Sequence, residues 1–62
     1  MINPSELKSE HVNRLVVYTP HEGAKPEQGR ITSWNDRFIF VDYYNTGRGQ
    51  ATPPEKLDFI YG

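Results

Sequence analysis

The sequence predicts a single small all-β domain, and three observations support this class. Runs of β-branched and aromatic residues recur along the 62-residue chain, separated by clusters of glycine, proline and asparagine, as is typical of short strands. Helix signals occur mainly near the N-terminus. Aromatic residues make up 13% of the chain, and such large side chains favour a packed core over disorder.

About five short strands are expected, in the segments 15–19, 29–34, 37–43, 50–52 and 57–61. The polar residues 21–28 carry no periodic pattern, so they are predicted to form a long loop after the first strand. Residues 53–56 begin with two prolines and are expected to form one helical turn with Thr52 as its cap.

The N-terminal residues 3–12 are the candidate for a short helix. Asn3 can cap it, Pro4 suits the first helical position, and Glu6 follows the cap by three residues. A helix this short is marginal by itself, so the segment is expected either to dock on the rest of the chain or to fray.

The central hairpin determines which side chains are expected to face the core. A two-residue turn at Asn35 and Asp36 would place Ile31 opposite Phe40, on one face of the sheet. The predicted core residues are Val17, Ile31, Phe38, Phe40, Leu57 and Phe59. Ile39 and Val41 would then form an apolar patch on the opposite face. The N-terminal segment is expected to cover this patch, and self-association or a partner is the alternative.

The order of the elements is typical of an SH3-like small barrel: a strand, a long loop, a central hairpin, a short strand, a helical turn and a final strand. The chain is therefore predicted to be one domain over residues 1–62. Residues 1–13 would form an N-terminal arm or short helix, and residues 14–61 the barrel.

Several segments between residues 15 and 59 resemble small phage- and prophage-encoded proteins that are SH3-like and mostly of unassigned function. The resemblance rests on Val16-Val17-Tyr18, Gly29-Arg30-Ile31-Thr32-Ser33, Asn35-Asp36-Arg37-Phe38-Ile39-Phe40-Val41 and Pro54-Glu55-Lys56-Leu57. It implies the barrel fold and a binding role, and it supplies no catalytic residues to assign to this chain.

Composition narrows the range of functions. The chain has no cysteine, which excludes disulfides and thiolate chemistry and favours the cytoplasm over secretion. No apolar run approaches the length of a membrane span, and the first residues do not resemble a signal peptide, so no membrane partner is expected. The net charge of −1 argues against a dedicated, non-specific nucleic-acid binder.

No catalytic or metal-binding motif is recognised. His11 and His21 lie in separate polar segments without the spacing of metal ligands. The serines lack the context of a nucleophile, and Gly47-Arg48-Gly49 is better explained by a turn than by a phosphate-binding loop. The chain is therefore predicted to be a non-enzymatic binding protein without a cofactor or metal.

The candidate binding residues are arginines interleaved with aromatic residues: Arg30, Trp34, Arg37, Tyr43, Tyr44 and Arg48. Trp, Tyr and Arg dominate the energetics of protein interfaces, so an adaptor or regulator that binds a protein is the leading hypothesis. Arginines and aromatic rings can also hold a nucleic-acid strand, which is the alternative. A third interpretation is that Trp34 and Tyr43 fill the ends of the barrel while the arginines solubilise the surface.

Overall fold

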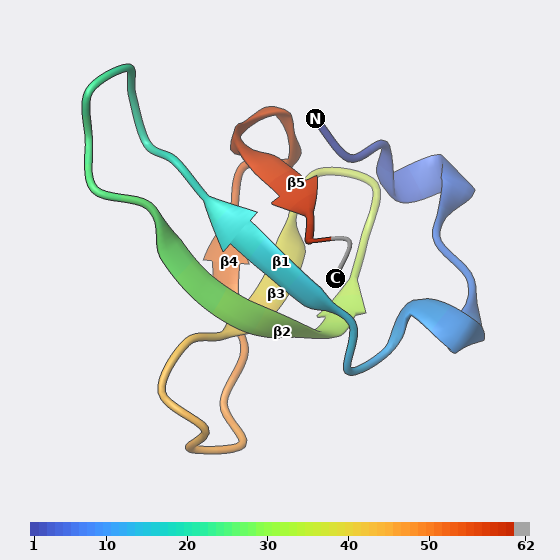
Figure 1. The fold of residues 1–62 in the computed structure, drawn as a ribbon. Helices are drawn as coiled ribbons and strands as arrows, with labels where there is room; N and C mark the ends of the chain where they lie inside the picture. The colour runs from blue at the N-terminus through green and yellow to red at the C-terminus, as the bar shows by residue number, and fades with distance from the viewer. Residues whose placement is uncertain (61–62) are drawn as a thin grey trace.

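The computed structural model describes residues 1–60 and shows five antiparallel strands in one sheet (Figure 1). The strands are β1 (Leu15–Tyr18), β2 (Glu27–Trp34), β3 (Ile39–Asp42), β4 (Gln50–Thr52) and β5 (Leu57–Phe59). Their order in the sheet is β4-β3-β2-β1-β5, which leaves β4 and β5 as open edges. The prediction of a five-stranded all-β domain is confirmed. Within the described residues, no helix is long and apolar enough to cross a membrane.

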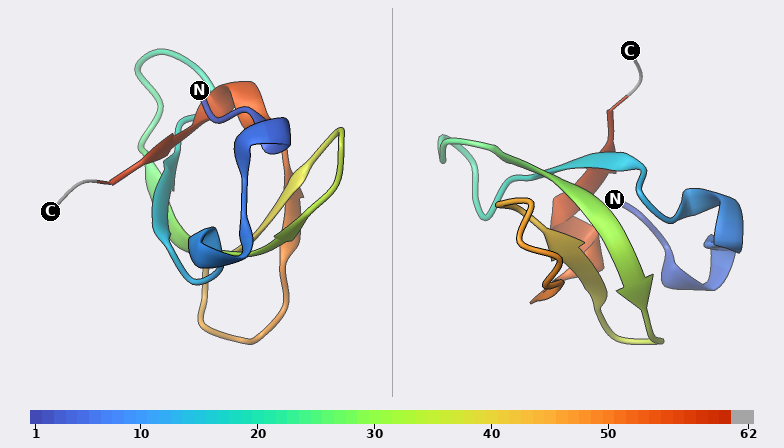
Figure 2. Two further views of the ribbon diagram at one scale, coloured as in Figure 1. Left: turned by 90° about the vertical axis from the view of Figure 1, so that its right-hand side faces the viewer. Right: turned by 90° about the horizontal axis from the view of Figure 1, so that it is seen from below.

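The sheet is strongly curled around its core (Figure 2). The longest strand, β2, pairs through its first half with β1 and through its second half with β3. A β-bulge between Ile31 and Ser33 interrupts the second pairing, and bulges increase the local bend and twist of a strand. The predicted helical turn is present as the 3₁₀ turn η3 (Pro54–Lys56), which links the two edge strands, although Pro53 rather than Thr52 is its cap.

The predicted N-terminal helix is replaced by two separate 3₁₀ turns, η1 (Pro4–Glu6) and η2 (Ser9–His11). The start of the segment follows the prediction, because the Asn3 side chain accepts a hydrogen bond of 3.1 Å from the N–H of Ser5. Leu7 then adopts an extended conformation, which ends the first turn. A helix made of the residues after Leu7 would be too short to offset the free-energy cost of starting it. Contacts with the rest of the fold therefore determine the path of the N-terminal segment.

The N-terminal segment docks across one end of the curled sheet (Figure 2). Ile2 retains only 4% of its exposed surface and belongs to the core cluster, and Leu7 packs against that cluster. The N–H of Ile2 donates to the carbonyl of Pro54 at 3.1 Å, and the terminal ammonium pairs with Asp58. The segment therefore contributes to the same core that contains Ile39 and Val41.

The observed core contains other side chains of β1 and β3 than those predicted. The buried apolar residues are Ile2, Val16, Ile31, Ile39, Val41 and Leu57. Ile31 and Leu57 were correctly predicted, and Phe59 packs against the core while partly buried. Val17 and Phe40 are only partly buried, and Phe38 is 40% exposed, so placing these three in the core was wrong.

The turn after β2 and the bulge explain the error on β3. The expected two-residue turn is a four-residue turn, residues 35–38, closed by a bond from the N–H of Asn35 to the carbonyl of Phe38. This turn moves the pairing by two residues, so that Trp34 pairs with Ile39, and the bulge takes one of them back, which leaves a net shift of one residue and pairs Ile31 with Val41 instead of Phe40. A one-residue shift exchanges the two faces of a strand. Ile39 and Val41 are consequently fully buried and offer no surface for self-association.

Candidate binding surface

A shallow groove of about 370 Å³ lies between the start of β1, the middle of β2 and the end of β3. It is lined by Leu15, Gln28, Gly29, Arg30, Asp42, Tyr43 and Asn45. The pairing of Leu15 with Arg30, and of Arg30 with Asp42, places these three residues in one row across the sheet, on its outer face. The groove therefore lies on the outer face of the three central strands.

The β3–β4 loop (residues 43–49) borders the groove and is held in shape by one carboxylate. Asp42 accepts hydrogen bonds from the N–H groups of Tyr44 at 3.2 Å, Thr46 at 3.1 Å and Gly47 at 2.9 Å. Asn45 and Gly47 have positive φ angles, which let the loop fold back over this carboxylate. These bonds restrain the loop in the free protein, before any partner is present.

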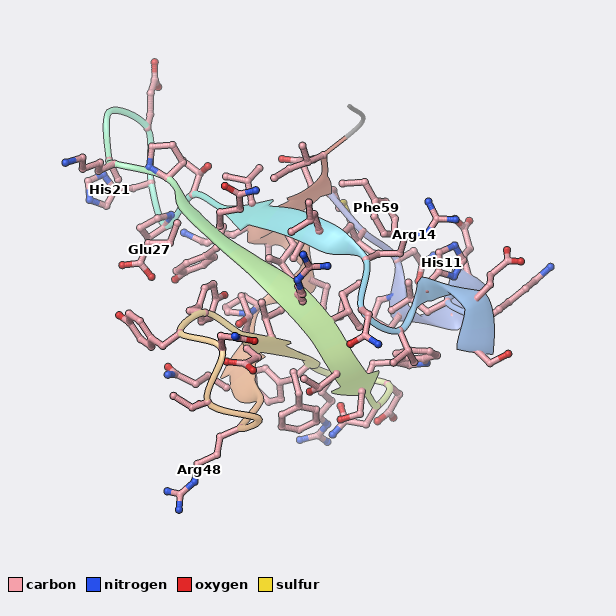
Figure 3. The ribbon with its side chains drawn as sticks, turned by 60° about the horizontal axis from the view of Figure 1, so that its bottom comes forward. His11, Arg14, His21, Glu27, Arg48 and Phe59 are labelled. Atoms are coloured by element: carbon pink, nitrogen blue, oxygen red, sulfur yellow. The ribbon has the colours of Figure 1, made fainter. Side chains whose placement is uncertain are left out.

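The ordered β3–β4 loop presents two side chains to solvent. Tyr44 is 70% exposed, although a large aromatic side chain usually buries much of its area. Arg48 is exposed and extends away from the sheet (Figure 3). The loop thus holds an aromatic ring and a guanidinium group in a position where a partner can reach both.

Tyr43 anchors the base of the same loop. Its hydroxyl shares a hydrogen bond of 2.7 Å with the hydroxyl of Thr52, which is almost completely buried, and its ring centroid lies 6.2 Å from that of Tyr18. Burial raises the pKa of the Tyr43 phenol above its ordinary value. Tyr43 therefore braces the base of the loop and also lines the groove.

The structure brings together some of the six predicted binding residues and separates the others. Arg30 and Tyr43 line the groove, and the β3–β4 loop that borders it carries Tyr44 and Arg48. Trp34 and Arg37 lie at the other end of β2, on and beside the β2–β3 turn. The predicted set therefore forms a four-residue group and a separate pair.

Trp34 lines two further hollows, of about 330 and 400 Å³, against the N-terminal segment. One is lined by Ser9, Val12, Thr32, Ser33 and Trp34, and the other by Asn3, Pro4, Ser5, Trp34, Asn35 and Asp36. The Trp34 side chain is partly buried and packs against the core, so part of its surface is committed to the fold. This agrees with the interpretation that Trp34 fills an end of the fold.

Asp42 and Asn45 also line the groove, and neither was predicted from the sequence. An acidic residue directly after an apolar strand, followed by a glycine-containing polar segment, is a signal that could have been recognised. Asp side chains commonly accept hydrogen bonds from backbone N–H groups a few residues further along the chain. This pattern predicts a turn. It does not predict how many N–H groups donate to the Asp42 carboxylate, because that number depends on the path of the folded loop.

The two histidines have local roles in the fold. His11 accepts a hydrogen bond of 2.9 Å at Nδ1 from the N–H of Lys8, and its ring centroid lies 5.5 Å from that of Phe59. Figure 3 shows His21 on the opposite side of the molecule from His11. Across residues 1–60, the structure contains no group of three or more histidine or acidic side chains that could hold a metal ion.

The Asp42 carboxylate is expected to make the stability of the fold depend on pH. The N–H of Gly47 is the largest cause lowering the pKa of Asp42, and the N–H groups of Thr46 and Tyr44 lower it further. A carboxyl group whose pKa is lower in the folded than in the unfolded state stabilises the fold above its unfolded pKa, roughly 3.9. This stabilisation is lost as the pH falls through the folded pKa.

Asp42→Asn is therefore expected to lower the free energy of unfolding at pH 7, and the difference from the wild type should shrink below about pH 4. Urea denaturation across pH 2.5 to 7 would measure both quantities. Asp36→Asn removes the same charge from the β2–β3 turn and is the control for net charge. A difference that stays constant with pH would contradict the role of the Asp42 charge.

Comparison of the chain with protein-family models, with curated proteins and with solved structures finds no match.

Proposed function

We propose that this chain is a non-enzymatic binding module that recognises a protein through the groove and the β3–β4 loop. The single observation that carries the proposal is the preorganised exposure of Tyr44, which is 70% exposed on a loop held by three hydrogen bonds to Asp42. Ordering a loop before binding reduces the entropy lost when the partner arrives. Tyr and Arg side chains are also those that most often dominate binding energy at protein interfaces.

The proposal includes an SH3-like architecture for the curled sheet. The strand order, the long bent β2 and the 3₁₀ turn between β4 and β5 support it, because these features occur together in small barrels of that kind. A cytoplasmic location and an origin among phage- or prophage-encoded proteins belong to the same proposal and rest on the sequence. The proposed role needs no cofactor and includes no catalytic step.

Tyr44→Ala is expected to abolish capture of the partner without unfolding the domain, because the ring is exposed and lies outside the core. The experiment is affinity capture from a lysate of the source cell with the full chain as bait, followed by quantitative mass spectrometry. Truncating a central aromatic residue of an interface typically costs about 2 kcal/mol or more, a loss of roughly thirtyfold in affinity.

Arg37→Ala is the matched control, because Arg37 is exposed in the β2–β3 turn, away from the groove. A protein retained by the wild type and by Arg37→Ala, but lost with Tyr44→Ala, would support the proposal. Identical capture by all three chains would refute it.

Nucleic-acid binding is the competing outcome of the same experiment. If the captured material is nucleic acid, titration of a single-stranded oligonucleotide should show a steep loss of affinity with salt, since phosphate contacts release counterions. A protein interface anchored by Tyr44 should depend only weakly on salt. A steep salt dependence that is reduced by Arg48→Ala would therefore favour the nucleic-acid alternative over a protein partner.

A further inference from the structure

The arginines at the groove and the β3–β4 loop make few contacts with the rest of the protein. Arg30 donates one hydrogen bond, 3.1 Å from Nη1 to the carbonyl of Asn13, and otherwise remains exposed. Arg48 is exposed at the far end of the loop (Figure 3). In the part of the chain that the structure describes, neither guanidinium forms an ion pair with a carboxylate. Both cations are therefore available to a partner.

The one carboxylate that lines the groove is committed to the protein's own backbone. Both oxygens of Asp42 accept N–H donors of the loop, with Oδ1 bonded to Tyr44 and Thr46 and Oδ2 bonded to Gly47. Although Arg30 and Asp42 pair across β2 and β3, their side chains make no ion pair. The acceptor oxygens of Asp42 are thus occupied within the loop, although the group keeps its negative charge.

The other nearby acidic residue is Glu27, at the start of β2. Side chains alternate between the two faces of a strand, so Glu27 is on the opposite face from Gln28 and Arg30. It pairs with Tyr18 of β1 and interacts electrostatically with Tyr43, but it is not among the residues that line the groove. Asp42 is therefore the one carboxylate among the residues that line the groove, and N–H donors of the loop already occupy its oxygens.

We infer that the partner segment recognised by this surface is an acidic peptide, held by Asp or Glu side chains on Arg30 and Arg48 and by an apolar side chain against Tyr44. This inference rests on the proposed function and specifies the chemistry of its partner. Guanidinium groups bind carboxylates in a planar, two-pronged geometry, which suits an extended acidic segment.

A peptide fits these observations better than a nucleic acid does. Tyr43 is braced by its bond to Thr52 and is partly buried, so Tyr44 is the one freely exposed ring of the pair. Strands of nucleic acid are usually held by several stacking rings and a continuous row of cations. Two arginines beside one exposed ring, in a chain of net charge −1, match a short acidic segment.

The test is selection from a random 12-residue peptide library against the immobilised full chain, followed by fluorescence anisotropy with the selected peptides. We expect the selected peptides to be rich in Asp and Glu, and exchange of these residues for Asn and Gln to weaken binding. Combining Arg30→Glu with Arg48→Glu should lower the affinity about tenfold or more, since two attractive contacts become repulsive. Arg37→Glu makes the same charge reversal away from the groove and should change the affinity less than about twofold.

Each alternative outcome has a defined meaning. Peptides without a charge preference that still require Tyr44 would overturn the acidic partner and leave the proposed function standing. Peptides unaffected by Tyr44→Ala would overturn both, and a library that yields no binder would overturn the acidic-peptide inference. If a 12-residue oligothymidylate displaces the selected peptides and binds more tightly than they do, the partner is a nucleic acid and the inference is wrong. Thermal unfolding of each variant verifies that the fold is retained.

Discussion

Ile39→Ala is expected to lower the free energy of unfolding by about 2–5 kcal/mol, the cost of deleting a fully buried aliphatic side chain. Ile39 has no exposed surface and belongs to the single core cluster, where the chain has few large side chains to compensate. A core in a domain of this size supplies only about 3–5 kcal/mol of net stability. The variant should therefore be largely unfolded at 25 °C, as measured by circular dichroism and urea denaturation.

Phe40→Ala is the matched control for Ile39→Ala, because Phe40 is the next residue on β3 and points to the outer face. Its side chain is only partly buried, so a cooperative transition should remain, with a smaller loss than for Ile39→Ala. A larger loss for Phe40→Ala than for Ile39→Ala would mean that the two faces of β3 had been assigned in the wrong order.

Gly29→Ala is expected to destabilise the fold by about 1–3 kcal/mol through overpacking. A Cβ at Gly29 would lie 2.6 Å from Cγ1 of Val41 and 2.9 Å from the carbonyl oxygen of Asp42, closer than van der Waals contact allows. Backbone must shift because one of these atoms belongs to the main chain of β3. The shift would separate β2 from β3 and distort the groove, so peptide binding should fall together with stability.

Gly47→Asn tests whether the loss of stability expected for Gly29→Ala comes from crowding around the added Cβ. Gly47 has a φ of +80°, a conformation that asparagine tolerates better than most residues, and a Cβ there would meet no atom within 4 Å. This variant should remain close to wild type in urea denaturation. A loss for Gly47→Asn as large as that for Gly29→Ala would contradict the expectation that open space around residue 47 and the tolerance of asparagine for positive φ preserve the fold.

The strands were predictable because their signals are local. The β-branched run at β1 and the residues of β4 match their predicted positions closely, and the 3₁₀ turn η3 begins at the second of the two prolines. Glycine, proline and asparagine separate these runs, because their backbone preferences favour turns and act within a few residues.

The last predicted strand extended to Tyr61, and that residue lies outside the described part of the chain.

The orientation of β3 was not predictable from local pattern. Residues 38–41 are apolar throughout, so alternation gives no indication of which face is buried. The side-chain oxygen of Asn35 accepts hydrogen bonds from the N–H groups of Arg37 at 2.8 Å and Phe38 at 2.7 Å. These bonds stabilise a turn that is longer than the predicted one. Together with the bulge in β2, this turn decides that Ile39 and Val41 form the core.

For the candidate surface, the sequence predicted the types of residue but not which of them lie together. Arginine and tyrosine were recognisable as candidate binding residues, but Arg30 and Tyr44 are 14 positions apart, and only the pairing of β2 with β3 brings the β3–β4 loop to the groove that Arg30 lines. The same pairing sends Trp34 and Arg37 to the other end of the sheet. Asp42 matters for a similar reason, since its role depends on three N–H groups that converge only in the folded loop.

For this protein, the sequence by itself determined the all-β class, the number of strands and the types of residue available for binding. These properties follow from conformational preferences and residue chemistry, which act locally. Only the tertiary structure decided that Ile2 joins the core, that β3 buries Ile39 and Val41, and that Asp42 orders the β3–β4 loop. These outcomes depend on strand register and on contacts between distant segments, because burial and backbone hydrogen bonding must be satisfied for the whole chain at once.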